Sequence, residues 1–259
     1  MTLPENDTSW LLSATISELQ SLLERKKLTS RELVLLYFKR IAMLDKEGPK
    51  LRAVLELNPD ALGIADSLDI ERLQGKIRGP LHGIPLMIKD NIDTADGMHT
   101  SAGSLALADH YAQSDAFAVR KLREAGAILL GKTNMTEWAN LISPTMFAGY
   151  SSRGGQTLNP YGPGEIFVGG SSSGSAVAVA AGLTAGSLGT ETSASVLSPA
   201  CQNSLVGIKP TVGLVSRSGV IPVSFTQDTI GTFGKTVADA ALLLQTVSGS
   251  DPNDPVTGS

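Results

Sequence analysis

The stretch Gly169–Ala200 reads GGSSSGSAVAVAAGLTAGSLGTETSASVLSPA. It begins with a loop of glycine and serine, continues as a helix of small residues, and ends in a second hydroxyl-rich turn at Thr192–Ser195. Loops of this composition let backbone N–H groups approach a ligand closely. They also place hydroxyls at the end of a helix, where the helix dipole favours negative charge. The pattern indicates a catalytic site, for which the remaining chain has to supply a base, a pocket and a scaffold.

The composition is that of a soluble enzyme. The 259 residues are 42% hydrophobic and 18% charged, which is enough for a substantial core. A formal net charge of −4 gives no reason to expect a nucleic-acid partner or binding to an anionic membrane. The sequence has no run of about 18 apolar residues, and its polar N-terminus lacks the features of a signal peptide. The single cysteine, Cys201, excludes an internal disulfide and favours a reducing, cytoplasmic location.

The hydrophobic pattern predicts an α/β fold in one domain, residues 1–259. Residues 1–75 are expected to form a helical layer with one weak strand. Its predicted elements are a helix at Thr15–Glu24, a helix opened by a capping box at Thr29–Glu32 and ending near Gly48, a strand at Leu51–Leu57 and a helix at Ala61–Leu73.

Residues 76–247 are expected to form the α/β core, because short strands alternate with helices there. The predicted elements are strands at Leu86–Ile88, Ala127–Leu130 and Ser204–Ile208, an extended segment at Val212–Val215, helices at Ala116–Ala125, Met135–Asn140 and Val237–Val247, and a long irregular loop at Ser143–Phe167. Long loops in compact domains usually carry function. Residues 248–259 are polar and are expected to form a linker or surface loop.

Three kinds of active site fit the sequence poorly. Gly170–Gly174 matches the G-x-S-x-G pattern centred on Ser172, but that motif needs a later histidine. His82, His99 and His110 all precede it, and each is expected to be a loop or surface residue. A phosphate-binding loop would need one of the established glycine motifs, which are absent. Asp90 and Asp93 do not make a set of metal ligands, so no metal site is predicted.

A serine nucleophile with a lysine base remains. A buried lysine can be neutral at physiological pH, because burial disfavours its charged form. Lys89 is the best candidate, since it follows the apolar segment Ile84–Ile88. From composition alone, a solvated surface lysine and merely flexible serine-rich loops remain open.

The segment Gly83–Asp93, GIPLMIKDNID, together with Gly169–Ala200, resembles the amidase signature family. The likeness extends over nearly all of the chain, and five further segments are similar to the branch that contains bacterial peptide amidases. These are SAGSLAL (101–107), LGKTNMTEWAN (130–140), SRGGQTLNPY (152–161), GIKPTVGLVSRSGVIPVSFTQDTIG (207–231) and TVADAALLL (236–244).

The resemblance implies a mixed central β-sheet flanked by helices and a Ser–cis-Ser–Lys triad. Lys89 matches the base, Ser171 the relay serine after the cis peptide, and Ser195 the nucleophile. Ser172 matches a serine that helps to hydrogen-bond the lysine, and the N–H groups of Thr192–Ser195 match the oxyanion hole. The implied reaction is hydrolysis of a small-molecule or peptide amide through an acyl-enzyme, without a cofactor.

Two features depart from the family pattern. The family commonly has glycine where this chain has Ala194, and a positive φ there would strain an alanine. Many members carry an arginine where this chain has Leu197. Family members are also longer, so the C-terminal part of the fold is expected to be missing, with a longer chain and a homo-oligomer both left open. Two alternatives follow: a weak or inactive family member that binds a ligand or partner, and one component of an amidotransferase that works on aminoacyl-tRNA.

Overall fold

A six-stranded mixed sheet forms the centre of the protein, as expected. The computed structural model describes residues 7–258, and its strand order is β1-β3-β2-β6-β8-β7. Strand β2 is parallel to both β3 and β6, whereas β1, β8 and β7 each run antiparallel to their neighbours. The carboxyl ends of β3, β2 and β6 therefore meet at one edge of the sheet, which is where ligands bind in open α/β sheets.

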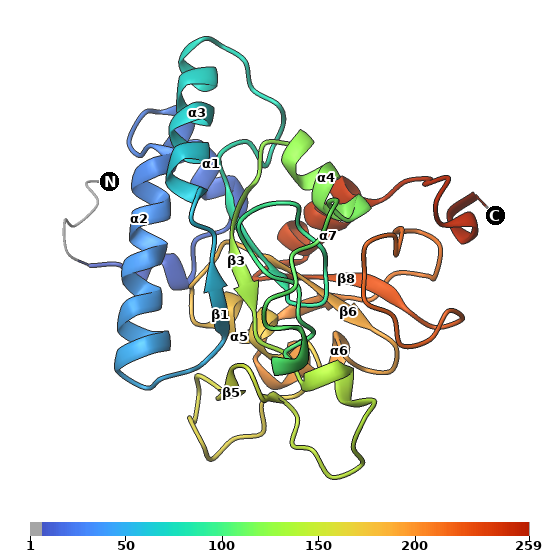
Figure 1. Ribbon diagram of the computed structural model, residues 1–259. Helices are drawn as coiled ribbons and strands as arrows, with labels where there is room; N and C mark the ends of the chain where they lie inside the picture. Colours follow the sequence, from blue (N-terminus) through green and yellow to red (C-terminus); the bar gives the residue numbers. More distant parts are fainter. Residues whose placement is uncertain (1–6, 259) are drawn as a thin grey trace.

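The first third of the chain forms the predicted helical layer with one strand. It comprises α1 (Ile16–Glu24), α2 (Ser30–Arg40) with a π-helical extension to Glu47, β1 (Val54–Leu57) and α3 (Ala61–Leu73). Capping boxes at Thr15 and Thr29 open α1 and α2, each satisfying two free backbone N–H groups. Helices α2 and α3 pack together beside β1 and β3 (Figure 1).

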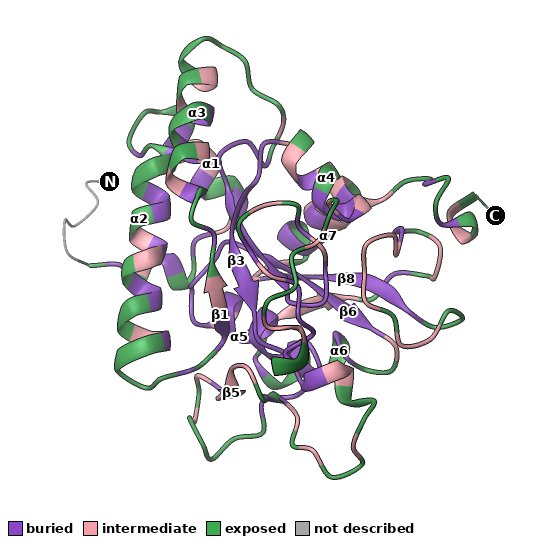
Figure 2. Cartoon of the chain, in the orientation of Figure 1, coloured by how far each residue is buried: buried purple, intermediate pink, exposed green. Residues whose placement is uncertain are grey.

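Helices cover both faces of the sheet. Helix α5 (Ser173–Ala180) and α6 (Leu197–Gln202) pack on the face that carries Phe233 of β8 (Thr229–Gly234). Helix α7 (Val237–Val247) covers the other face, where the Thr232 hydroxyl donates to the Ala240 carbonyl, and α4 (Phe117–Glu124) packs against α7. Figure 2 shows that the sheet between these layers is almost entirely buried.

Strands β2 (Pro85–Lys89) and β3 (Ile128–Thr133) confirm the two predicted core strands. Pro85 is the first residue of β2, where its missing N–H interrupts no ladder. Strand β3 does not end at Gly131 as predicted. It runs through that glycine because the Glu56 carbonyl of β1 lies only 2.2 Å from where a Cβ would be, so a side chain would block the pairing.

Two predictions for the middle of the chain were wrong in detail. Residues 135–140 form only a short 3₁₀ turn (Glu137–Asn140), in which Trp138 and Ala139 have positive φ. The loop at 143–167 is irregular except for a small hairpin made by β4 (Tyr150–Ser151) and β5 (Gly155–Gln156).

The sequence patterns missed three elements of the core. These are β6 (Ser187–Glu191), α6 and β8, while β7 (Val206–Ile208) and α7 were predicted. In β8, Gly231 and Gly234 interrupt the alternation of side chains that identifies a strand. Both glycines are required by close packing, since the Ile208 carbonyl lies 2.7 Å from a Cβ built on Gly231. Residues 212–215 form a turn rather than the predicted extended segment.

The C-terminal segment 248–258 is anchored to the body of the protein rather than free as a linker. Asp251 accepts a hydrogen bond from the Ser216 hydroxyl, and Asp254 forms an ion pair with Arg217 at 2.6 Å. Both carboxylates are buried, and the short helix Pro255–Gly258 follows them. Within residues 7–258, no helix is long and apolar enough to cross a membrane.

Replacing Gly174 by alanine should destabilise the protein although alanine favours helices. A Cβ there would lie 2.4 Å from the carbonyl oxygens of Ala53 and Asn134. Gly174→Ala is therefore expected to lower the free energy of unfolding by about 3 kcal/mol. Gly63→Ala is the matched control, because nothing lies within 4 Å of that position in α3.

For Gly63→Ala a gain of about 0.5–1 kcal/mol is expected, from helix propensity alone. Urea unfolding measures both changes. Equal changes in the two variants would show that α5 does not pack as closely as described.

Candidate functional site

Lys89 is the last residue of β2 and is completely buried. Its Nζ lies 2.8 Å from the Ser171 hydroxyl, 2.8 Å from the Thr190 hydroxyl and 3.2 Å from the Thr190 carbonyl oxygen. These partners come from the loop before α5 and from the end of β6. The sheet thus places the predicted base against the predicted relay serine, and the alternative of a solvated lysine is excluded.

Burial also changes the charge state of this amine. It lowers the pKa of Lys89 to about 7, against the opposing effect of the negative charges of Asp228 and Glu191. An ordinary lysine has a pKa near 10.4 and stays charged at neutral pH. At pH 7 about half of the Lys89 amines are therefore neutral and able to accept a proton.

Ser171 sits in a loop that leaves almost no free space. Gly169 has a φ of +74°, and a Cβ there would lie 2.7 Å from the Pro199 backbone. The peptide bond between Gly170 and Ser171 is cis, as the resemblance implied. The Thr136 N–H donates to the Ser171 carbonyl at 3.0 Å. Helix α5 begins two residues later, so the relay serine lies between a tight loop and a buried helix.

Ser172 does not bond to the lysine, which corrects the expectation from the sequence. Its hydroxyl donates to the Thr190 carbonyl at 3.0 Å, and its N–H donates to the Ser195 carbonyl at 3.1 Å. Ser172 therefore ties the loop of Ser171 to the turn of Ser195. It supports Lys89 indirectly, through the position of Thr190.

The turn Thr192–Ser195 follows β6 and precedes α6. Ala194 has a φ of +57°, in the left-handed region that favours glycine, so the strain predicted for an alanine here is present. Within residues 7–258, no hydrogen bond uses the N–H groups of Ser193, Ala194 or Ser195. The Ser195 side chain is mostly buried, and in this same part of the chain its hydroxyl makes no hydrogen bond to Ser171.

Four functional neighbours were missed from the sequence: Thr190, Asn91, Glu191 and Asp228. Glu191 accepts the N–H groups of Val196 at 2.7 Å and Leu197 at 2.9 Å, so its carboxylate spans the whole turn. Thr190 and Glu191 lie within the opening stretch itself, and Asn91 within the lysine segment. Their types gave no warning, because each acts through a contact with a distant part of the chain.

Asp228 links the turn to a second loop. Its carboxylate accepts the Thr192 hydroxyl at 2.5 Å and the N–H groups of Val223 and Ser224 at 2.7 and 2.8 Å. It immediately precedes β8, and the failure to recognise that strand concealed it. The loop also exposes Phe225, which is 81% accessible.

The histidines lie outside this site. His82 is a buried loop residue whose Nε2 lies 2.9 Å from the Leu68 carbonyl, as expected, and burial lowers its pKa. His110 is exposed. His99 is not a free surface residue, since it hydrogen-bonds Glu56 at 2.8 Å and stacks on Tyr111. Among the described residues, no group of three or more acidic, histidine or cysteine side chains could hold a metal.

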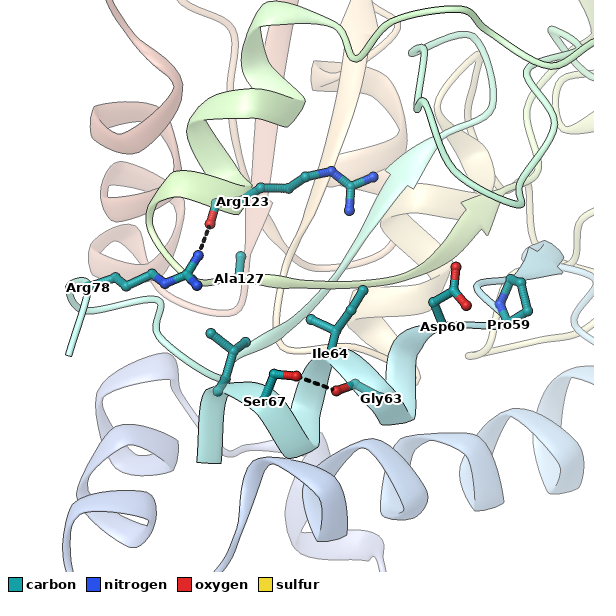
Figure 3. Close-up of a pocket in the computed structure, with 10 residues that line it drawn as sticks. Pro59, Asp60, Gly63, Ile64, Ser67, Arg78, Arg123 and Ala127 are labelled. Atoms are coloured by element: carbon teal, nitrogen blue, oxygen red, sulfur yellow. Dashed lines mark hydrogen bonds between the residues drawn. The ribbon is translucent and has the colours of Figure 1, made fainter. Parts of the chain in front are cut away.

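A cavity of about 640 Å³ lies well away from the lysine and the serines (Figure 3). It is formed between α3 and the turn that joins α4 to β3, with Ile64 and Ala127 on its walls. Arg78 and Arg123 border it, but both are already paired with carboxylates. These two arginines are therefore not free to bind an anionic ligand there.

Comparisons with known proteins agree with this site. The chain is 48% identical over 255 residues to a putative amidase of Schizosaccharomyces pombe, covering 98% of this chain and 43% of that protein. The solved structure of native peptide amidase from Stenotrophomonas maltophilia is 52% identical, with a TM-score of 0.95, covering 98% of this chain and 51% of that one. A glutamyl-tRNA(Gln) amidotransferase of Chloroflexus aurantiacus is 44% identical over 215 residues, covering 83% of this chain and 43% of the matched polypeptide.

The chain spans about half the length of these relatives. The similarity to the peptide amidase nevertheless extends over nearly the whole of the fold described here. Residues 32–258 match the family described as Amidase. The protein therefore belongs to the amidase family.

Proposed function

We propose that this chain carries, in one amidase-type domain, the catalytic residues of a hydrolase that cleaves a carboxamide or the C-terminal amide of a peptide and releases ammonia. The observation that carries the proposal is the buried Lys89 amine, 2.8 Å from the Ser171 hydroxyl and with a pKa of about 7. A base of this kind replaces the histidine of better-known serine hydrolases.

The proposed mechanism passes one proton along three side chains. Neutral Lys89 accepts the proton of Ser171, which in turn takes the proton of Ser195. The Ser195 oxygen attacks the amide carbon and forms a tetrahedral intermediate. The proton then returns through Ser171 to the leaving nitrogen, because an amine leaves poorly unless it is protonated. Water hydrolyses the acyl-enzyme in the second half of the cycle.

The unpaired N–H groups of the turn support an oxyanion hole at Thr192–Ser195. Glu191 takes the next two N–H groups of the chain, at Val196 and Leu197, so within residues 7–258 those of Ser193, Ala194 and Ser195 remain available to the substrate. One such donor typically contributes about 10²–10³ in rate. The Ser171–Ser195 hydrogen bond that the mechanism needs would form when substrate binds, since such bonds often tighten only in the complex.

Peptide-amide substrates are favoured over transfer of ammonia to aminoacyl-tRNA. Identity to the peptide amidase structure exceeds that to the amidotransferase, and it extends over more of the chain. The net charge of −4 also gives a tRNA no electrostatic attraction. Activity that requires added partner proteins would favour the amidotransferase instead.

A catalytically weak family member is the second candidate, and Ala194 is the observation that favours it. A left-handed alanine costs roughly 1–2 kcal/mol, and it lies next to the nucleophile. A fluorophosphonate probe separates the two candidates directly, because only an activated Ser195 becomes covalently labelled.

Replacing the nucleophile should abolish turnover. Incubated with a panel of carboxamides and peptide amides, Ser195→Ala is expected to release ammonia at least about 10³-fold more slowly than the unmodified protein. Ser198→Ala is the matched control, because that serine lies in α6 outside the triad. Equal background release from the unmodified protein and Ser195→Ala would contradict the enzyme proposal.

The rate should depend on pH through the lysine. Because the pKa of Lys89 is lowered to about 7 and only its neutral form accepts a proton, kcat/KM should rise about tenfold per unit below pH 7 and level off above it. Lys89→Met should remove this dependence together with most of the rate. A flat profile for the unmodified protein between about pH 6 and 10 argues against a titrating lysine.

Ala194→Gly should stabilise the protein. Glycine relieves roughly 1–2 kcal/mol of left-handed strain and gives back part of it through a more flexible unfolded chain. The expected net gain in the free energy of unfolding is about 0.5–1 kcal/mol, measured in urea. Ala108→Gly, at an ordinary φ of −59°, should instead lose stability. A loss in both variants would show that Ala194 is unstrained.

A further inference from the structure

Asn91 lies two residues after the lysine and contacts the same threonine. Its Nδ2 donates to the Thr190 hydroxyl at 3.0 Å, and its side chain is 3% exposed. Its Oδ1 is buried and has no hydrogen-bond partner within residues 7–258. A buried polar atom without a partner is costly and calls for an explanation. The mechanism proposed above gives Asn91 no role.

Counting hydrogens at Lys89 shows what the threonine must do. The neutral amine has two N–H groups and one lone pair for its three partners. The Thr190 carbonyl can only accept, so it takes one N–H. The remaining N–H and the lone pair are divided between the hydroxyls of Ser171 and Thr190. The proton relay works only when the lone pair faces Ser171.

Protonation removes this freedom. The ammonium has three N–H groups and no lone pair, so both hydroxyls must accept from it. The hydrogen of the Thr190 hydroxyl then has to point away from Lys89 and needs another acceptor. Within residues 7–258, Asn91 is the only other side chain in hydrogen-bond distance of that hydroxyl.

We infer that Asn91 is a positioning residue, which supplies the acceptor for the Thr190 hydroxyl each time Lys89 takes up the proton. Its amide oxygen and nitrogen have almost the same shape, so a half-turn of the side chain exchanges them. The unpartnered Oδ1 is the acceptor held for the protonated state. The same hydrogen bond prevents the Thr190 hydroxyl from competing with Ser171 for the lysine lone pair.

This inference rests on the proposed function for its role in catalysis, but its hydrogen bonding can be tested without turnover. Two charged groups, Asp228 and Glu191, act on Lys89, and both raise its pKa. Neither is altered in the variants below, so a change in the pKa of Lys89 reports on Thr190 and Asn91.

The test is a titration of the Lys89 side chain, followed by its ¹³Cε resonance and assigned by the loss of that signal in Lys89→Met. Asn91→Leu deprives the Thr190 hydroxyl of its acceptor in the protonated state. The pKa of Lys89 is therefore expected to fall by about 0.5–1 unit, the size of one hydrogen bond. An unchanged pKa overturns the inference.

A double-mutant cycle separates this role from a merely structural one. Thr190→Val removes the hydroxyl, so Asn91→Leu should leave the pKa of Lys89 unchanged in that background. A shift of equal size in both backgrounds would attribute the effect to packing and overturn the inference. Asn58→Leu, another buried asparagine that bonds to the Leu129 carbonyl far from the lysine, is the control for lost stability.

Fluorophosphonate labelling at pH 9, where Lys89 is neutral, gives the catalytic readout. Asn91→Leu is expected to label roughly 10-fold more slowly than the unmodified protein, and the double variant no more slowly than Thr190→Val. Labelling of the unmodified protein that is no faster than that of Ser195→Ala would refute the proposed function alone, because the titration still decides the role of Asn91. Normal labelling of Asn91→Leu would refute the catalytic role of Asn91 and leave the proposed function standing.

Discussion

The desolvated amine of Lys89 is the constraint on which the site depends. An isolated charge in the protein interior is so unfavourable that a buried group shifts its pKa and becomes neutral instead. Here the neutral form is also the useful one, because it can accept a proton at physiological pH. The sheet creates this environment by placing Lys89 at the end of its central parallel strand, between β3 and β6. Within the described part of the chain, its hydrogen-bond partners come only from Ser171 and Thr190.

Small residues make this arrangement possible. Helix α5 consists of serine, glycine, alanine and valine, and its first seven residues are all buried. Gly174 lets the first turn approach the end of β3 so closely that its N–H donates to the Asn134 carbonyl at 2.9 Å. The Ser175 hydroxyl bonds to Thr133 and to the Leu188 carbonyl, joining the helix to two strands. The glycine- and serine-rich composition therefore reflects close packing on the sheet as well as chemistry.

Local signals allowed much of the fold to be predicted from the sequence. Capping boxes at Thr15 and Thr29, and the apolar periodicity of Val237–Val247, identified three helices closely because those interactions lie within a few residues. The positions of Lys89, Ser171 and Ser195 followed from motifs. Strand β8 was missed because its glycines serve contacts with distant elements that no local pattern reveals. The Lys89–Thr190 contact joins residues 101 apart in the chain, so only the folded sheet discloses it.

The compactness of α5 also determines where this protein can change its substrate range. Because every side chain on the helix between Ser173 and Val179 is enclosed, a larger residue there would disturb the lysine rather than reshape a binding surface. The irregular loop 143–167 and the loop that carries Phe225 are free of that restriction, and both expose large apolar side chains. Evolution or directed engineering of specificity would therefore act on these two loops, while the helix that supports the relay stays nearly invariant in volume.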